Sequence, residues 1–536
     1  MKPIYFTLYF CFLAGGSIFI CTPCFTDTQI LPKWIYALTT TALGIIALSI
    51  CHLSNTKVSI SQKQLFYAIE SLCFLQAIWS IYQWSKLLIT TSHAISRAIG
   101  ATGTFDNPAG LSACLSLSIP FILYSLHQAD KYKNIHIGIL ITVIVALLLT
   151  ESRTGWSSTF VCLTLYGWEI GKHHFMQRKR RFCFFIATLL LVSFCIGGYI
   201  YKKDSADGRM LIWQCTWDMV KEKPLSGYGI NGFEAKYMDF QAQYFALHPQ
   251  SKYGLLADNV KHPFNEFLSV AVHFGLIGIL VLLAIAFFLI RCYRQEKTME
   301  KSICLLSLVG LSVFSFFSYP FTYPFTWLVV LLDICVLAQT PIKSVMLVVN
   351  QKLKYSFAIL IMGLSPLSLY MLTQRIYDEM EWKKAVCLSL NGDSKQAFGK
   401  YCLLMERLKD NPYFLYNYAV ELYIAEHYHE SLQIAKLCKN YWSDYDLELL
   451  SAMAYEKTEN ADNAEKCYKK AAYMCPNRFV PLYQLALLLK NKGKVKEARS
   501  LAHHIMNKPI KIPSPTINRI KREMRKLLTM TIYEKE

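Results

Sequence analysis

Charged side chains are scarce in this sequence. Only 17% of its 536 residues are Asp, Glu, Lys or Arg, whereas 54% are hydrophobic and the mean hydropathy is +0.27. This balance excludes an ordinary soluble protein. Apolar runs long enough to cross a bilayer recur through the first 375 residues, so we expect a membrane protein.

Acidic residues are too few to balance the basic ones. The chain has 37 Asp and Glu against 56 Lys and Arg, which gives a formal net charge of +19. Such a charge could attract nucleic acid. In a protein that crosses a membrane many times, however, basic residues gather in the cytoplasmic loops. We therefore expect no nucleic-acid partner.

Signals for a metal or a nucleotide are also lacking. The 18 cysteines lie mostly inside apolar runs, and no cluster of cysteine and histidine residues has the spacing of a zinc site. The glycine-rich stretch KPLSGYGINGF, from Lys223 to Phe233, lacks the Lys-Ser/Thr ending of a nucleotide P-loop. We expect no metal and no cofactor.

The apolar runs predict eleven membrane spans, at residues 4–21, 33–52, 64–90, 109–126, 136–150, 155–170, 182–201, 264–290, 302–318, 324–340 and 355–373. The four most basic loops, at 127–134, 171–182, 291–301 and 343–354, then fall on one side. Positive charge marks the cytoplasmic side. We therefore expect a cytoplasmic N-terminus, with the alternate loops and the residues after 373 on the outer face.

A repeat begins after about residue 376. Small residues recur at intervals of 34, 33 and 34 in two series twelve residues apart: Ala385, Ala419, Ala452 and Ala486, and Ala397, Ser431, Ala464 and Ala498. This resembles the tetratricopeptide repeat, two antiparallel helices with small residues where they touch. The solenoid could dock a peptide or protein partner, or serve as a spacer.

The expected fold class is therefore all-α. A polytopic transmembrane bundle would occupy residues 1–375, with an outer loop at 202–263. An α-solenoid of tetratricopeptide-like repeats would follow over 376–510, and a basic tail over 511–536.

Two motifs on the predicted outer face lie at membrane corners. GTFDNPAGLSA leads into the fourth span, where Asn107 and Pro108 suit a turn that caps a helix. ESRTGW places Arg153 between two apolar runs. An arginine at that depth is costly unless it snorkels to the surface or binds a ligand.

Two further motifs lie in and after the outer loop. GRMLIWQCTW carries Arg209, with Trp213 and Trp217 spaced for an amphipathic helix at the membrane interface, and the glycine-rich stretch follows it. FNEFL then opens the eighth span and carries Asn265 and Glu266. His262 lies three residues before Asn265.

In this order the four motifs resemble the O-antigen ligase and polymerase family of polytopic membrane glycosyltransferases, over about residues 100–340. The resemblance implies a glycan donor on a polyprenyl diphosphate in a bacterial cytoplasmic membrane. With eleven spans, the repeats would then be periplasmic. The family commonly has His directly before the Asn, where this sequence has Phe264. His262 stands two residues earlier, about 200° away on a helix, unless Pro263 breaks the helix there.

The resemblance implies roles for five residues. Arg153 and Arg209 would bind the donor diphosphate, since arginine is always charged and presents a planar fork to phosphate oxygens. His262 would be the general base, with Glu266 as second candidate and Asn265 completing the catalytic set. Direct displacement would invert the anomeric carbon.

Several alternatives stay open at this point. The acceptor could be lipid A-core, another glycan repeat or a protein Ser/Thr, and an outward repeat domain slightly favours a polypeptide. The chain could instead be a non-catalytic scaffold with the repeats as a docking arm, in which case Phe264 would mark lost chemistry. A lipid-linked glycan transporter would need charges deep in the spans and related halves, and the sequence has few such charges and no such symmetry.

Overall fold

The computed structural model describes residues 3–54, 59–90, 100–129, 131–174, 185–186, 188–189, 193, 197–339 and 351–529. Over these ranges the regular secondary structure is helical throughout, which confirms the all-α prediction. The chain divides into two compact units. The membrane unit contains residues 1–200 and 281–380, and the loop–repeat unit contains residues 201–280 and 381–536.

The membrane unit is built from apolar helices. They are α1 (Pro3–Phe19), α2 (Ile30–Leu53), α3 (Gln62–Thr90), α5 (Pro108–Gln128), α6 (Lys133–Leu149), α7 (Arg153–His174), the second part of α11 (Glu266–Gln295), α12 (Met299–Ser315), the 3₁₀ helix η1 (Pro320–Thr322), α13 (Pro324–Ala338) and the first part of α14 (Gln351–Leu390). Among the described residues, five helices (α2, α3, α5, α11 and α14) are long and apolar enough to cross a membrane, and α1, α6 and α13 are shorter apolar helices.

Ten of the eleven predicted spans coincide with a described helix. The seventh, at 182–201, lies largely outside the described residues, as do most of the basic loops at 171–182 and 343–354. The count of eleven and the sidedness of the loops therefore stay predictions.

Helix α5 lies at the centre of the membrane unit. Every residue from Gly110 to Ser125 is buried, and the helix packs against α3, α6, α7, α12 and α13. Small residues allow this close approach, since a Cβ atom on Gly155 of α7 would collide with Ser112 Oγ of α5. The predicted cap is present, since Asn107 Oδ1 accepts from Gly110 N at 2.9 Å.

Three loops predicted to share the outer face meet at one end of the membrane unit. Ala101 N donates to the Leu149 carbonyl at 2.9 Å, beside the ESRTGW corner. Asn107 Nδ2 donates to Tyr323 Oη at 3.1 Å, in the loop before α13. This common end is what a shared side of the membrane requires.

Helix α11 is interrupted at Gly275, where φ is 60° and ψ is −152°. The glycine-rich turn at 224–229 lies against the break, and Tyr228 N donates to the Val272 carbonyl at 2.7 Å. A Cβ atom on Gly227 or Gly275 would lie within 2.4 Å of a carbonyl oxygen of the other segment. Glycine is therefore required for this approach, and the turn pairs with peptide groups that the break removes from the helix.

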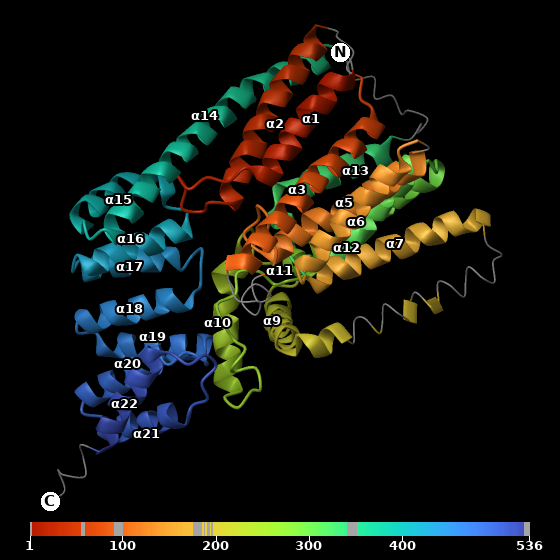
Figure 1. The fold of residues 1–536 in the computed structure, drawn as a ribbon. Helices are drawn as coiled ribbons and strands as arrows, with labels where there is room; N and C mark the ends of the chain where they lie inside the picture. Colours follow the sequence, from red (N-terminus) through yellow and green to blue (C-terminus); the bar gives the residue numbers. More distant parts are fainter. Residues whose placement is uncertain are drawn as a thin grey trace, which may run out of the picture. The chain divides into compact units, whose positions relative to one another are not determined.

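The loop–repeat unit holds two helices of the outer loop, α9 (Lys203–Glu222) and α10 (Gly232–Leu247), and the first part of α11. The end of α14 then leads into the repeat helices: α15 (Ser394–Leu408), α16 (Pro412–Ile424), α17 (Tyr428–Cys438), α18 (Tyr445–Lys457), α19 (Ala461–Met474), α20 (Val480–Asn491), α21 (Val495–Asn507) and α22 (Pro515–Thr529). Figure 1 shows α15–α22 as a stack of short helices coloured from teal to blue.

Each repeat helix from α15 to α22 packs on the next one in the chain, as in a solenoid. All eight small residues of the two predicted series have no exposed surface, so they are the points where the helices touch. The predicted tetratricopeptide-like solenoid is confirmed. The predicted basic tail contains α22, which packs on α21 through Ile520, Met524 and Leu527.

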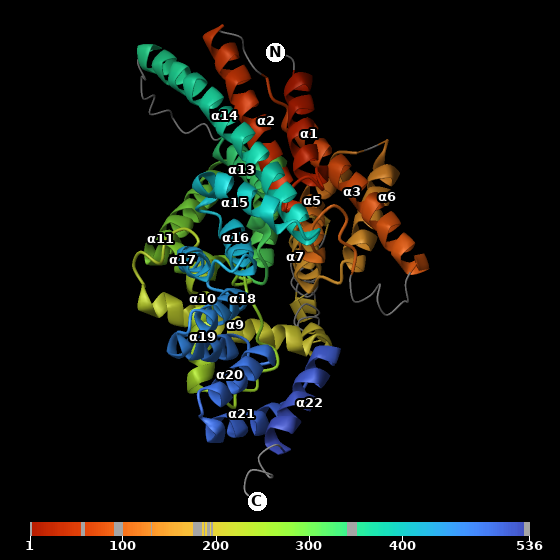
Figure 2. The ribbon, with the colours of Figure 1, turned by 90° about the vertical axis from the view of Figure 1, so that its left-hand side faces the viewer.

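The outer loop and the repeats share one apolar core. Helix α10 packs on α9 and α19, and both views place it beside α18 and α19 (Figures 1 and 2). Phe233, Tyr237 and Met238 of the loop join Tyr445 and Met474 of the repeats in a single buried cluster. The loop is predicted within the membrane domain, whereas its contacts in the structure group it with the repeats. The domain boundaries stay predictions.

A larger side chain at a buried helix–helix contact tests the packing of the solenoid. Ala464 on α19 is fully buried, so Ala464→Leu should cost about 1–3 kcal/mol of unfolding free energy through overpacking. Ala472→Leu on the same helix is the control, because Ala472 is only half-buried and should cost much less. Thermal unfolding of the full chain in detergent measures both, and equal costs would contradict the packing.

A pH dependence follows from Asp444, the buried N-cap of α18. Burial raises the pKa of this carboxyl to about 6. The folded chain then binds the proton more tightly than the unfolded chain, so stability falls as pH rises from about 4 to 6. Asp444→Asn keeps a capping oxygen and removes the charge. Its melting temperature relative to wild type should be higher at pH 7.5 than at pH 4, and the reverse order would contradict this.

Candidate functional site

Helix α9 holds the peptide that leads into α11. The Arg209 guanidinium carbon lies 5.4 Å from the centroid of the Phe264 ring. One turn later Trp213 Nε1 donates to the Pro263 carbonyl at 3.0 Å. The Trp213 side chain thus holds the loop by a hydrogen bond. The Trp217 side chain is 52% exposed, and its contact with a lipid surface stays a prediction.

Pro263 precedes the start of α11, so the condition under which His262 lies in a loop is met. Phe264 has a φ of 52°, in the left-handed region that a bulky residue rarely adopts. Asn265 Oδ1 accepts from Leu268 N at 3.0 Å and caps α11, which begins at Glu266. His262 therefore lies in the loop, and the 200° helical offset does not apply to it. Phe264, at the position of the family histidine, faces Arg209 instead.

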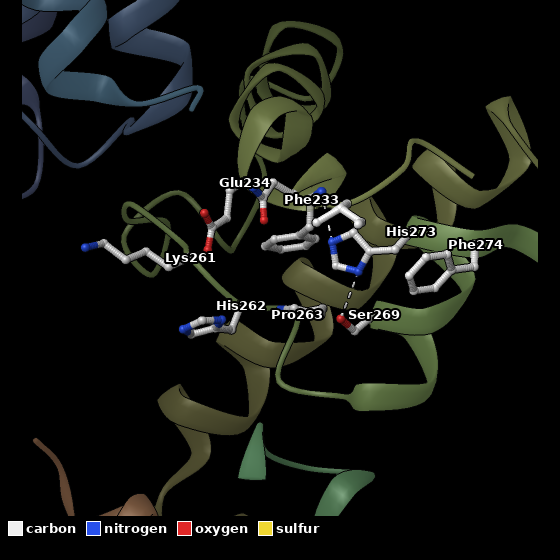
Figure 3. A pocket seen from close by; sticks show the side chains of 10 residues that line it. Phe233, Glu234, Lys261, His262, Pro263, Ser269, His273 and Phe274 are labelled. Atoms are coloured by element: carbon white, nitrogen blue, oxygen red, sulfur yellow. Dashed lines mark hydrogen bonds between the residues drawn. The ribbon is translucent and has the colours of Figure 1, made fainter. Parts of the chain in front are cut away.

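His262 lines a small cavity of about 170 Å³ (Figure 3). Three segments form its wall: the start of α10, the stretch before α11, and the first turns of α11. Its polar side chains are those of Asn231, Glu234, Lys261, His262, Ser269 and His273. The cavity brings together His262 and three groups that sequence analysis did not select, namely Glu234, Lys261 and His273.

The Glu234 carboxyl and the His273 imidazole both belong to the cavity wall. Burial raises the pKa of Glu234, and the Lys261 ammonium opposes that rise. Phe233 N donates to His273 Nε2 at 3.5 Å, and Ser269 Oγ lies 3.3 Å from Nδ1. This pattern needs a neutral ring with its hydrogen on Nδ1, so His273 orients the start of α10. The role of His262 as a base stays a prediction.

The other predicted residues lie outside this cavity lining. Asn265 caps the helix and Glu266 is its first residue. Arg153 belongs to the membrane unit, where it begins α7 and donates to the Gly198 carbonyl at 2.5 Å. Its pairing with Arg209 in one donor site stays a prediction. In the described residues, no group of three or more His, Cys, Asp or Glu side chains could hold a metal ion.

The cap on α11 can be tested separately from chemistry. Asn265→Ala should lower the unfolding free energy by about 0.5–2 kcal/mol, whereas Asn265→Asp should keep most of it, because Asp also caps helices. Thermal unfolding of the full chain compares the two variants. Equal losses in both would contradict a capping role.

The chain was compared with protein families, curated proteins and solved structures. Residues 138–283 match the family described as O-Antigen ligase. All five predicted site residues fall inside the matched segment, whereas the GTFDNPAGLSA motif falls outside it. No curated protein matched the chain.

Among solved structures, the crystal structure of the APC/C hetero-tetramer Cut9-Hcn1 is similar over 92% of this chain and 89% of that chain, with 10% identity and a TM-score of 0.26. No argument rests on a likeness of that degree. The apolar helices and the matched segment show that the chain is a membrane protein that carries an O-antigen ligase domain over residues 138–283.

Proposed function

We propose that the protein is a glycosyltransferase that moves a glycan from a polyprenyl diphosphate to an acceptor hydroxyl on the outer face of a bacterial cytoplasmic membrane. One observation carries the proposal. Inside the O-antigen ligase segment, Arg209 contacts Phe264 while His262, two residues earlier, lines a polar cavity. A cation on α9 thus contacts the turn that carries the proposed base.

The cation suits the donor side of the reaction. As the anomeric carbon–oxygen bond breaks, the polyprenyl diphosphate leaves with its electron pair and gains negative charge. Phe264 supports the face of the Arg209 guanidinium. The in-plane N–H groups of a guanidinium are the ones that meet phosphate oxygens, and a contact with the ring face helps to orient them. Arg153 is the proposed second cation.

The cavity suits the acceptor side. The acceptor oxygen attacks the anomeric carbon, and its proton passes to a ring nitrogen of His262. Attack opposite the leaving group inverts the anomeric centre. Glu234 and Lys261, in the same cavity, offer an acceptor and a donor to neighbouring hydroxyls of a sugar. Glu266 stays the second candidate for the base.

The substrates proposed are a lipid-linked glycan and an acceptor of one of three classes: lipid A-core, a growing glycan or a protein Ser/Thr. The proposed orientation has a cytoplasmic N-terminus and periplasmic repeats. This arrangement puts the repeats and the outer loop, which pack together, on the same side of the membrane.

Complementation of a deletion strain tests the proposal. Arg209→Ala and Arg153→Ala should each lower glycan transfer about a hundredfold or more, because each removes a preorganised charge from the leaving group. His262→Ala should lower it by about 10²–10⁴-fold, as expected for a lost general base. Surface polysaccharide and glycoproteins from one culture are read together, so the missing product identifies the acceptor.

The control is Arg407→Ala, which removes an exposed cation from α15 and should leave transfer unchanged. Equal membrane levels of all variants must be shown first. Wild-type transfer in Arg209→Ala and His262→Ala would overturn the site and favour the non-catalytic scaffold.

A further inference from the structure

We infer that the repeat domain is a positioning support for the cavity that holds His262. Its face formed by α16, α18, α19 and the turn after α19 is occupied by the outer loop of the same chain. This inference rests on the proposed function only for its catalytic consequence. The hydrogen bonds between the loop and the repeats that carry it join residues 186 to 220 positions apart. The contacts act at three places around the cavity.

First, side-chain amides hold the stretch that precedes Lys261. Asn477 Nδ2 donates to the Ala257 carbonyl at 2.8 Å and Gln241 Nε2 donates to the Asp258 carbonyl at 3.1 Å. Asn259 Oδ1 accepts from Tyr445 N at 3.2 Å. This stretch has no helix of its own, so these bonds replace the regular pairing that would otherwise fix its backbone.

Second, the turn before α18 holds the start of α10. Ser443 N donates to the Glu234 carbonyl at 2.9 Å, and Ser443 Oγ donates to Asp239 Oδ1 at 2.7 Å. Lys470 on α19 forms an ion pair with Asp239 at 2.9 Å. Glu234 lines the cavity, so a repeat residue is bonded directly to the cavity wall.

Third, α16 supports the residue next to His262. The Lys261 ammonium lies 4.5 Å from the centroid of the Tyr413 ring. The ring itself packs against Trp442, with centroids 5.2 Å apart, and Trp442 is buried. Trp442 thus supports the Tyr413 ring, and the cation–π contact with that ring restricts the position of the Lys261 ammonium.

Together these contacts give the repeats a catalytic consequence. A base in an unsupported loop samples many positions, and a displacement of about 1 Å can cost on the order of a hundredfold in rate. Asn477, Gln241 and Tyr413 touch neither reacting group, so they are positioning residues. They act by fixing the backbone before His262 and the side chain of Lys261.

The test uses the full chain in membranes, with hydrogen exchange of residues 255–262 measured beside the glycan transfer rate. Asn477→Ala leaves the Ala257 carbonyl without its donor, so exchange should rise about tenfold and the maximal transfer rate should fall about tenfold. The donor concentration for half-maximal rate should stay unchanged, because donor contacts are intact.

Tyr413 offers a graded comparison. Tyr413→Ala should lower the maximal rate by about two- to fivefold, and Tyr413→Phe should restore it, because phenylalanine keeps the ring face that meets Lys261. Lys492→Ala is the control: it removes a repeat-domain ion pair with Asp462 and Glu465 that does not touch the loop, and should change neither measurement.

The outcomes separate the two claims. Unchanged exchange in Asn477→Ala would overturn the support by the repeats, whatever the activity. Raised exchange with an unchanged transfer rate would overturn the positioning role. A wild-type chain that transfers no glycan in any assay would overturn the proposed function, while the exchange data would still decide whether the repeats fix the loop.

Discussion

The buried amide of Gln241 is the constraint on which the loop–repeat unit depends. Its Nε2 donates to the Met474 carbonyl at 2.6 Å and to the Asp258 carbonyl, and its Oε1 accepts from Tyr237 at 2.8 Å. A fully buried amide must be paired, since an unmet partner costs about 1–3 kcal/mol. The apolar cluster around it can therefore close only when α10, the stretch before α11 and the repeats are all in place.

The cavity follows from that closure. With the backbone near Asp258 fixed, Pro263 and the left-handed Phe264 turn the chain into α11, and α9 holds the turn through Arg209 and Trp213. The break at Gly275 separates this short entry segment of α11 from the apolar run beyond it. The polar groups of the site thus belong to the loop–repeat unit.

The sequence predicts what local patterns determine. A period of about 34 residues in Ala and Ser predicts the solenoid, because close helix contacts need small side chains. Proline interrupts helices, so Pro263 left open that His262 lies in a loop. The cavity partners could not be predicted. His273 looks like a lone polar residue in an apolar run, and Glu234 and Lys261 look like ordinary loop charges. Their meeting depends on contacts such as Gln241 with Met474, 233 residues apart, which no local pattern reveals.

Thiol alkylation of the reduced full chain tests the shared core most directly. Cys475 is fully buried beside Asn259, with its Sγ 3.9 Å from Oδ1, and burial raises the pKa of its thiol. Cys387 and Cys402 are exposed on the repeats. If the loop and the repeats form one body, mass spectrometry should find Cys387 and Cys402 labelled quickly and Cys475 labelled only on unfolding. Labelling of Cys475 at the rate of Cys387 would contradict the account.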